Sequence, residues 1–367
     1  MQPRRRIAIL AEGAFSIFGA KTAVGVLRYS RHQVVAVIDS TKSGKVVEDI
    51  LGFGGDIPIV ESVEQALAFR PEVLLIGIAP TGGQLLPQFR HALLEAIRHG
   101  LDIWSGLHYF LSDDEELAAE AARCNVRLWD VRKPRRDLVV GSGKALTTKA
   151  YVVLTVGTDC NVGKMTAALE LRNALAQRGV RAAFVATGQT GILIEGEGTP
   201  LDAVPGDFMS GEVEHLVLQK DAEGAEVILV EGQGSLLHPG FGPVTLALML
   251  GAMPDDFILC SVPTRQTYRP NHVLPIPPLK EIIRLYEGVM GVAYKAPKVR
   301  GLALNTSELS DRDAFDIIER YTQEIGLPVC DPFRTGVHNL VDALLPYMES
   351  KRTRPVTDEH SNGEALK

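Results

Sequence analysis

Apolar and polar positions in the first third of the chain alternate in blocks, each about as long as one strand or one helix. An apolar run at residues 7–11 precedes a helix-like stretch at 21–29 and a second apolar run at 34–39. This is the order of a strand, a helix and a parallel strand. Ser62 and Gln65 form the capping pattern that opens a short helix. The alternation continues through residues 73–79, 89–99 and 101–107. It predicts a parallel sheet with helices on both faces.

The segment after the first strand bears on what this half binds. Residues 11–23 contain no G-x-G-x-x-G, the loop that holds a dinucleotide pyrophosphate in many such sheets. Asp39 ends the second strand, where it either contacts a ribose or simply terminates the strand. Residues 55–80 resemble the CoA-binding domain of succinyl-CoA ligases. That resemblance concerns the fold and does not fix a function.

The middle of the chain carries a candidate phosphate-binding loop. An apolar strand at 152–156 is followed by a loop between Gly157 and Gly163, and then by an amphipathic helix that begins near Lys164. Such a loop points backbone N–H groups, a helix N-terminus and a lysine charge at an anion. The segment therefore predicts phosphate binding, and it resembles the GTD-type loop of dethiobiotin synthetase and its relatives.

The residue after the lysine departs from the usual nucleotide loop. Met165 stands where a Ser or Thr normally ligates Mg²⁺, and the hydroxyl arrives only at Thr166. Mg²⁺ prefers oxygen ligands, which a thioether does not provide. Either Thr166 ligates the ion in a shifted position, or the loop holds a phosphate-bearing ligand without metal.

Further buried runs at residues 182–187, 225–232, 256–262 and 299–305 predict a second doubly wound sheet. Glu231 follows one of these runs, where it serves either as a Walker B acid or as a strand-terminal cap. Asn305 follows another, in a segment that resembles the synthetase strand whose Asn contacts a purine base. We expect the ligand of the loop to be held by Gly157, Thr158, Asp159, Cys160, Asn161, Val162, Gly163, Lys164, Met165, Thr166 and Asn305.

Two irregular segments carry candidate substrate ligands. The first contains Asp202, Asp207 and Glu212, and the second contains Arg265, Arg269 and His272. Carboxylates pair with an ammonium group, and arginines bind carboxylates in a bidentate manner. We expect Asp202, Arg265 and Arg269 to bind substrate. Asp207 also fits a helix cap, and the arginines also fit ordinary surface ion pairs.

The predicted fold is α/β, with two doubly wound, mostly parallel domains: a Rossmann-like N-terminal domain and a P-loop NTPase-like C-terminal domain. We place the first domain at residues 1–135, a linker at 136–150, the second domain at 151–349 and a flexible tail at 350–367. The linker lies in a basic segment, residues 127–149, that is punctuated by Pro and Gly. The tail is polar and has no apolar face.

Composition narrows the function classes. With 38 Lys and Arg against 45 Asp and Glu, the formal net charge is −7, which disfavours a nucleic-acid binder. Four widely spaced cysteines suggest neither a zinc site nor a disulfide framework. The apolar run at the start is too short for a signal peptide or a membrane span. We expect a cytoplasmic protein with small-molecule substrates, no nucleic-acid or membrane partner and a homo-oligomeric state.

Several motifs together resemble one bacterial family over nearly the whole chain. They are GTDCNVGKMTAALEL, TGQTGILIEG, LDAVPGDFMSGEVE, VEGQGSLLHPG and IPPL, in this order. The chain is similar to the DgcN-type D-glutamate (D-amino acid) N-acetyltransferases, a family long labelled as of unknown function. Met between Lys and Thr is part of that family's loop.

The resemblance implies acetyl transfer from acetyl-CoA to the amino group of D-glutamate or a related D-amino acid, in D-amino acid catabolism. The loop would anchor the CoA phosphates, and no metal is expected. A base must deprotonate the amine before it attacks. Glu231 and His238 are the first candidates for this base, and Asp207 is the third.

Two other functions remain open from the sequence. A Mg-ATP-dependent carboxylate-activating ligase like dethiobiotin synthetase fits the loop and Glu231, but Met165 argues against it. A non-catalytic nucleotide sensor also fits a phosphate loop beside a second domain. Metal-dependent ATP hydrolysis would distinguish the ligase, and tight nucleotide binding without turnover would distinguish the sensor.

Overall fold

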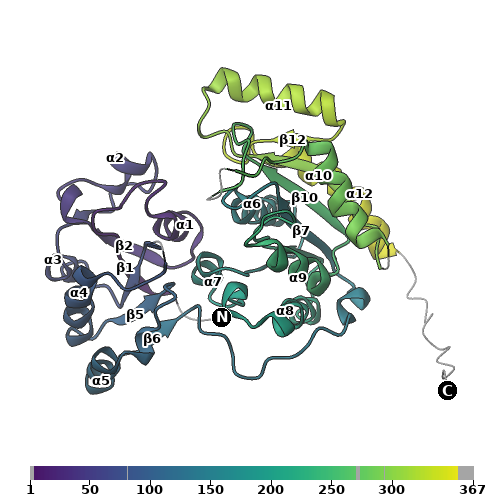
Figure 1. The fold of residues 1–367 in the computed structure, drawn as a ribbon. Coiled ribbons are helices and arrows are strands. Elements are labelled where there is room, and N and C mark those ends of the chain that lie inside the picture. Colours follow the sequence, from purple (N-terminus) through teal and green to yellow (C-terminus); the bar gives the residue numbers. More distant parts are fainter. Residues whose placement is uncertain (1–3, 81, 270–272, 293, 354–367) are drawn as a thin grey trace, which may run out of the picture. The chain divides into compact units, whose positions relative to one another are not determined.

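Figure 1 shows the fold, a computed structural model that describes residues 4–80, 82–269, 273–292 and 294–353. The chain forms two compact units. One contains the residues up to Ser142 together with Phe184–Leu216, and the other contains Gly143–Ala183 together with the residues from Val217 onward. The α/β fold predicted from the sequence is confirmed, since each half of the chain builds a six-stranded parallel sheet.

The N-terminal sheet has the strand order β3-β2-β1-β4-β5-β6, and its neighbouring strands pair in parallel. Its strands are β1 (Arg6–Leu10), β2 (Gln33–Ile38), β3 (Ile59–Val60), β4 (Val73–Ile76), β5 (Asp102–Ser105) and β6 (Leu128–Asp130). The connecting helices are α1 (Lys21–Tyr29), α2 (Val47–Leu51), α3 (Val63–Leu67), α4 (Pro87–Arg98) and α5 (Glu115–Cys124), with the 3₁₀ turns η1 (Ser40–Lys42) and η2 (Leu111–Asp113). The predicted strand-helix-strand start therefore corresponds to β1, α1 and β2.

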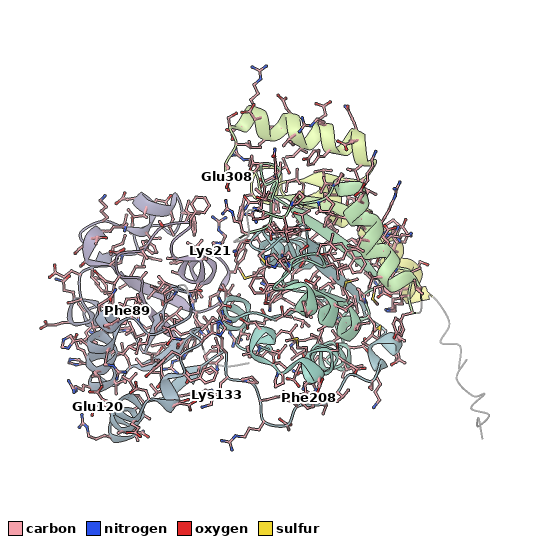
Figure 2. The ribbon with its side chains drawn as sticks, in the orientation of Figure 1. Lys21, Phe89, Glu120, Lys133, Phe208 and Glu308 are labelled. Atoms are coloured by element: carbon pink, nitrogen blue, oxygen red, sulfur yellow. The ribbon has the colours of Figure 1, made fainter. Side chains whose placement is uncertain are left out.

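Helices cover both faces of this sheet. In Figure 1, α3 and α4 lie on one side of the strands and α1 lies on the other. Phe89 of α4, labelled in Figure 2, is fully buried. Ser62 caps α3 by accepting a hydrogen bond from the Gln65 N–H at 3.2 Å, as the capping pattern predicts. The core of this unit is thus built by the apolar runs that the sequence pattern identified.

Asp39 has a structural task at the end of β2. Its carboxylate accepts hydrogen bonds from the backbone N–H groups of Gly13 (3.2 Å) and Phe15 (3.0 Å), which lie in the loop after β1, and of Thr41 (3.0 Å). The side chain is fully buried. Because these donors already occupy the carboxylate, Asp39 terminates its strand and closes the loop, and this geometry does not favour a ribose contact.

The second sheet has the order β12-β11-β10-β7-β9-β8. Its strands are β7 (Tyr151–Gly157), β8 (Ala182–Val185), β9 (Val227–Val230), β10 (Asp256–Ser261), β11 (Lys298–Leu304) and β12 (Val329–Cys330). The helices of this half are α6 (Lys164–Gln177), α7 (Gln189–Glu195), α8 (Met209–Ala222), α9 (Gly242–Ala252), α10 (Leu279–Gly291), α11 (Asp311–Ile325) and α12 (His338–Thr353). Three 3₁₀ turns accompany them: η3 (Lys144–Thr147), η4 (Leu201–Ala203) and η5 (Gly206–Phe208).

Strand β7 lies between β9 and β10 and is buried along its whole length. The loop that follows it therefore starts between the carboxyl ends of two neighbouring strands, the usual position of a ligand site in such sheets. Within the predicted linker, η3 is the regular element that the structure describes. Residues 350–353 of the predicted tail continue α12, and residues 354–367 lie outside the described part. No helix within the described residues has the length and apolar character needed to cross a membrane.

Candidate functional site

The loop from Gly157 to Gly163 turns tightly between β7 and α6. Gly163 has a φ of +98° and lies at the N-cap of α6, a backbone conformation that favours glycine. A Cβ added at Gly157 would lie 2.8 Å from Val162 Cγ2 and 2.9 Å from Lys164 Nζ. The two glycines therefore let the loop close over its own lysine.

Lys164 is buried beneath this loop, with only 6% of its surface exposed. Its Nζ donates a hydrogen bond to the Asp159 carbonyl oxygen at 2.8 Å. Burial lowers the pKa of Lys164, because a low-dielectric surrounding disfavours the charged form. The stem packs beside the end of β9, where a Cβ added at Gly232 would lie 3.0 Å from Lys164 Cδ. Strand β9 and the loop thus hold the lysine in one place.

The Asp159 carboxylate connects the loop to the segment that follows β10. Its fully buried carboxylate accepts hydrogen bonds through Oδ2 from Arg265 Nη1 at 2.9 Å and from the Arg269 backbone N–H at 3.1 Å. Arg265 Nη1 also donates to the Cys160 carbonyl oxygen at 2.5 Å. Asp159 Oδ1 has no hydrogen-bond partner among the described residues. Arg265 therefore links the segment after β10 to the phosphate loop through hydrogen bonds.

The two arginines expected to bind substrate differ in position. The Arg265 side chain is 8% exposed and occupied by the loop, whereas that of Arg269 is 56% exposed. Arg269 Nη2 lies 3.9 Å from Glu308 Oε1, and Glu308 is labelled in Figure 2. His272 lies outside the described residues. Arg269 is thus the arginine of the pair whose charged group faces solvent.

His238 has both ring nitrogens occupied. Nδ1 accepts hydrogen bonds from the backbone N–H groups of Gly240 (3.1 Å) and Phe241 (3.2 Å), so the proton is assigned to Nε2. Nε2 lies 2.6 Å from the Arg269 carbonyl oxygen, to which it donates. A general base needs a free lone pair. The observed bonds therefore suit His238 to positioning the Arg269 segment rather than to accepting a proton.

Asp159, Cys160 and His238 bring potential metal-ligating atoms within 4.8 Å of one another. Asp159 and His238 already bind neighbouring protein groups. Burial raises the pKa of the Cys160 thiol to about 11. The lone pair on His238 Nδ1 accepts from backbone donors, and Nε2 carries the proton. Arg265 already neutralises the Asp159 carboxylate.

Glu231 and Asn305 both lie close to the loop. Glu231 directly follows β9, the neighbour of β7, and is buried. Asn305 follows β11, where its backbone N–H donates to the Ser261 carbonyl oxygen at 2.8 Å. A Cβ added at Gly163 would lie 3.9 Å from Asn305 Cβ. The structure thus brings together the loop, Glu231, His238, Arg265 and Asn305, all within the second unit.

Sequence reasoning missed Tyr286 of α10. Its hydroxyl donates to the Gly157 carbonyl oxygen at 2.8 Å and accepts from the Leu236 N–H at 3.3 Å. The side chain is fully buried, and burial raises its pKa to about 12. Tyr286 therefore ties the start of the loop to the segment after β9. Its position in an ordinary amphipathic helix gave no signal for this role.

The acidic segment does not form one cluster. Asp202, Asp207 and Glu212 all belong to the first unit. Asp202 pairs with Arg132, Glu212 accepts a hydrogen bond from Arg135 Nε at 2.9 Å, and Asp207 is exposed in η5. These three acids thus have separate surroundings. Among the described residues, Asp202 and Glu212 have an ion-pair partner and Asp207 has none.

Both halves of the chain match models of known domain families. Residues 40–134 match the Rossmann-like domain DUF1611_N, and residues 139–341 match the P-loop domain DUF1611_C, each described as a domain of unknown function. The chain belongs to the DUF1611 family. A crystal structure of a DUF1611 protein from Anabaena variabilis has 41% sequence identity and a TM-score of 0.89, covering 94% of this chain and all of that one.

Two relatives of this DUF1611 protein carry an enzyme name. A protein from Tritonibacter scottomollicae, named D-glutamate N-acetyltransferase, is 37% identical over 89% of this chain and 95% of its own length. A protein of the same name from a Pseudoalteromonas species is 36% identical over 76% of this chain and 83% of its own length. The resemblance inferred from the sequence motifs is thereby confirmed at the level of the family.

Proposed function

We propose that this DUF1611 protein transfers an acetyl group from acetyl-CoA to the amino group of D-glutamate or a related D-amino acid. The observation that carries the proposal is the 36–37% identity to two proteins named D-glutamate N-acetyltransferase, over 76% and 89% of the chain. The four cysteines are free thiols, which supports the reduced cytoplasm as the location within the same proposal.

The phosphate loop supports CoA as the acetyl carrier. CoA is rich in phosphate, and the loop presents backbone N–H groups, the N-terminus of α6 and the Lys164 ammonium to one place. Lys164 would leave the Asp159 carbonyl oxygen for a phosphate oxygen, which is a stronger acceptor because it is charged. Asn305, beside Gly163, would contact the adenine. This assignment of the loop needs no metal.

The reaction removes two protons from the substrate nitrogen, which starts as an ammonium group and ends as an amide N–H. A base takes the first proton, and the neutral amine then attacks the thioester carbonyl carbon. The new C–N bond forms, the C–S bond breaks to release CoA as a thiolate, and the second proton leaves the nitrogen and is taken up by the thiolate. We propose Glu231 as the base, since it lies at the end of β9 beside the loop. Asp207 is the alternative, because the His238 ring nitrogens are occupied.

A thiol-release assay with acetyl-CoA and a panel of D- and L-amino acids tests the proposal. We expect release with D-glutamate, and a fall of about 10²–10⁴-fold in kcat for Glu231→Gln if the carboxylate is the base. Asp56→Asn, an exposed acid in the first unit, is the matched control. Absence of thiol release with every amino acid of the panel contradicts the proposal.

One observation favours a second candidate, a Mg-ATP-dependent ligase. Glu231 ends the strand next to β7, which is where nucleotide-hydrolysing P-loop proteins hold a metal-binding acid. Met165 opposes this candidate, because its thioether replaces the expected oxygen ligand. ATP hydrolysis measured with and without Mg²⁺ separates the two. Strong metal-dependent turnover of ATP favours the ligase.

A further inference from the structure

The first unit contains a cavity that the phosphate loop does not use. It has a volume of about 310 Å³ and lies where the chain leaves β4, β5 and β6, with Pro80, Gly83, Gly106, His108 and Arg132 among its lining residues. The carboxyl ends of parallel strands are the usual position of ligands in such sheets. This cavity therefore has the location of a binding site.

Backbone contacts hold two walls of the cavity together. The Gly83 carbonyl oxygen accepts hydrogen bonds from the backbone N–H groups of His108 and Tyr109, each at 3.0 Å. Gly83 has a φ of +65°, and a Cβ there would lie 2.4 Å from His108 Cδ2. The imidazole thus packs directly on the glycine, and these contacts join the loops after β4 and β5 that line the cavity.

Arg132, which lines the cavity, forms an ion pair with the neighbouring Asp202. Arg132 is buried, its Nε donates to the Gly106 carbonyl oxygen at 2.7 Å, and its Nη1 pairs with Asp202. No hydrogen bond joins Arg132 Nη2 to another residue within the described part of the chain. The Asp202 side chain is 26% exposed, so it keeps contact with solvent. Arg132 Nη2 can therefore donate a hydrogen bond to a ligand, and the Asp202 carboxylate can accept one.

His108 adds a neutral polar group. Its Nε2 lies 3.8 Å from Asp202 Oδ2, and the ring is half exposed. Burial, and next the charge of Arg132, lower the pKa of His108. The imidazole is therefore uncharged near neutral pH and offers a hydrogen bond without adding a second positive charge.

We infer that this cavity binds the amino-acid substrate, with Asp202 holding its ammonium group and Arg132 holding a carboxylate. The inference rests on the proposed acetyl transfer and gives it a substrate site. A zwitterion fits because it matches an Arg–Asp pair group by group, and because arginine binds carboxylates in a bidentate manner. The volume lies at the lower end of the roughly 300–1,000 Å³ of ligand sites, which suits a small acid better than the whole of CoA.

Calorimetric titration in the presence of saturating CoA, which carries no acetyl group to transfer, tests the assignment. The ligands are D-glutamate and glutarate, which has the same two carboxylates but no amine. We expect the wild-type protein to bind D-glutamate at least about tenfold more tightly, because a charged hydrogen bond to Asp202 is lost with glutarate. In Asp202→Asn this preference should vanish. Asp56→Asn is the control with an unrelated exposed acid.

A second variant keeps the test independent of the ion pair. Ala79 lines the cavity and is exposed, so Ala79→Phe fills the space without burying a new side chain in the core. It should weaken D-glutamate binding at least about tenfold, while Ala119→Phe, on an exposed position of α5, should not. Thermal melting checks that each variant is folded.

The outcomes separate this inference from the proposed function. If the wild-type protein acetylates D-glutamate while Asp202→Asn keeps its preference or Ala79→Phe binds normally, the cavity assignment is wrong and the enzyme function stands. If Ala79→Phe loses CoA binding instead, the cavity belongs to CoA, and the inference is again wrong. If the wild-type protein neither binds nor acetylates any amino acid, the proposed function itself fails.

Discussion

Removing the charge of Lys164 is the most informative change in the phosphate loop. Lys164→Met keeps the buried stem that packs beside Gly232 and removes only the ammonium group. A hydrogen bond from a charged donor contributes about 1.5–3 kcal/mol, and about 1.4 kcal/mol corresponds to a tenfold change in affinity. We therefore expect the KM for acetyl-CoA and the Kd for CoA to rise at least about tenfold.

The assay combines initial rates at varied acetyl-CoA with titration of CoA, both on protein checked by thermal melting. Lys144→Met, at an exposed lysine of η3, serves as the matched control and should leave both constants unchanged. Lys164→Ala should show the same loss of affinity together with lower stability, because it also empties the space of the buried stem. Unchanged acetyl-CoA constants in a folded Lys164→Met protein would refute the assignment of the loop to CoA.

Four other changes test separate parts of the site. Arg265→Lys should lower the free energy of unfolding by about 2 kcal/mol in urea titrations, because the buried guanidinium binds both Asp159 and the loop backbone; an equal loss in Arg269→Lys, whose side chain is exposed, would contradict this. Tyr286→Phe should cost about 1 kcal/mol of unfolding free energy, and no loss would mean that the Gly157 contact is unimportant. The Cys160 thiol, with a pKa raised by burial to about 11, should be alkylated slowly near neutral pH and faster as the pH rises toward that value; fast alkylation at neutral pH would exclude a raised pKa. Exhaustive chelation should leave acetyl transfer unchanged, because Met165 supplies no oxygen ligand; activity that collapses and returns with Mg²⁺ would favour the ligase.

Local patterns in the sequence were enough to predict most of the fold. Strands β1 and β2, helix α1 and the start of α3 follow from apolar periodicity and a capping pattern that extend over a few residues. The phosphate loop was equally predictable, because Gly157, Gly163 and Lys164 are close in sequence and need one specific backbone path. Residues that are close together in the sequence determine these features, so the features can be recognised from the sequence alone.

The partners of the site residues were much harder to predict. Arg265 was expected to bind substrate, and its partner Asp159 lies 106 positions away in the chain. Tyr286 contacts Gly157 across 129 positions. Which side chains meet at such separations depends on strand order and on how loops pack, and no local pattern encodes it. The Arg132–Asp202 pair, 70 positions apart, was invisible for the same reason.

The most direct test of the central claim is the product of the reaction itself. Purified protein is incubated with acetyl-CoA labelled in the acetyl group and with D-glutamate, without ATP, and products are measured by mass spectrometry together with the released CoA thiol. We predict labelled N-acetyl-D-glutamate in an amount equal to the CoA released, and much less product with L-glutamate. CoA release without any N-acetylated amino acid, or product formation that requires ATP, would contradict the proposed acetyl transfer.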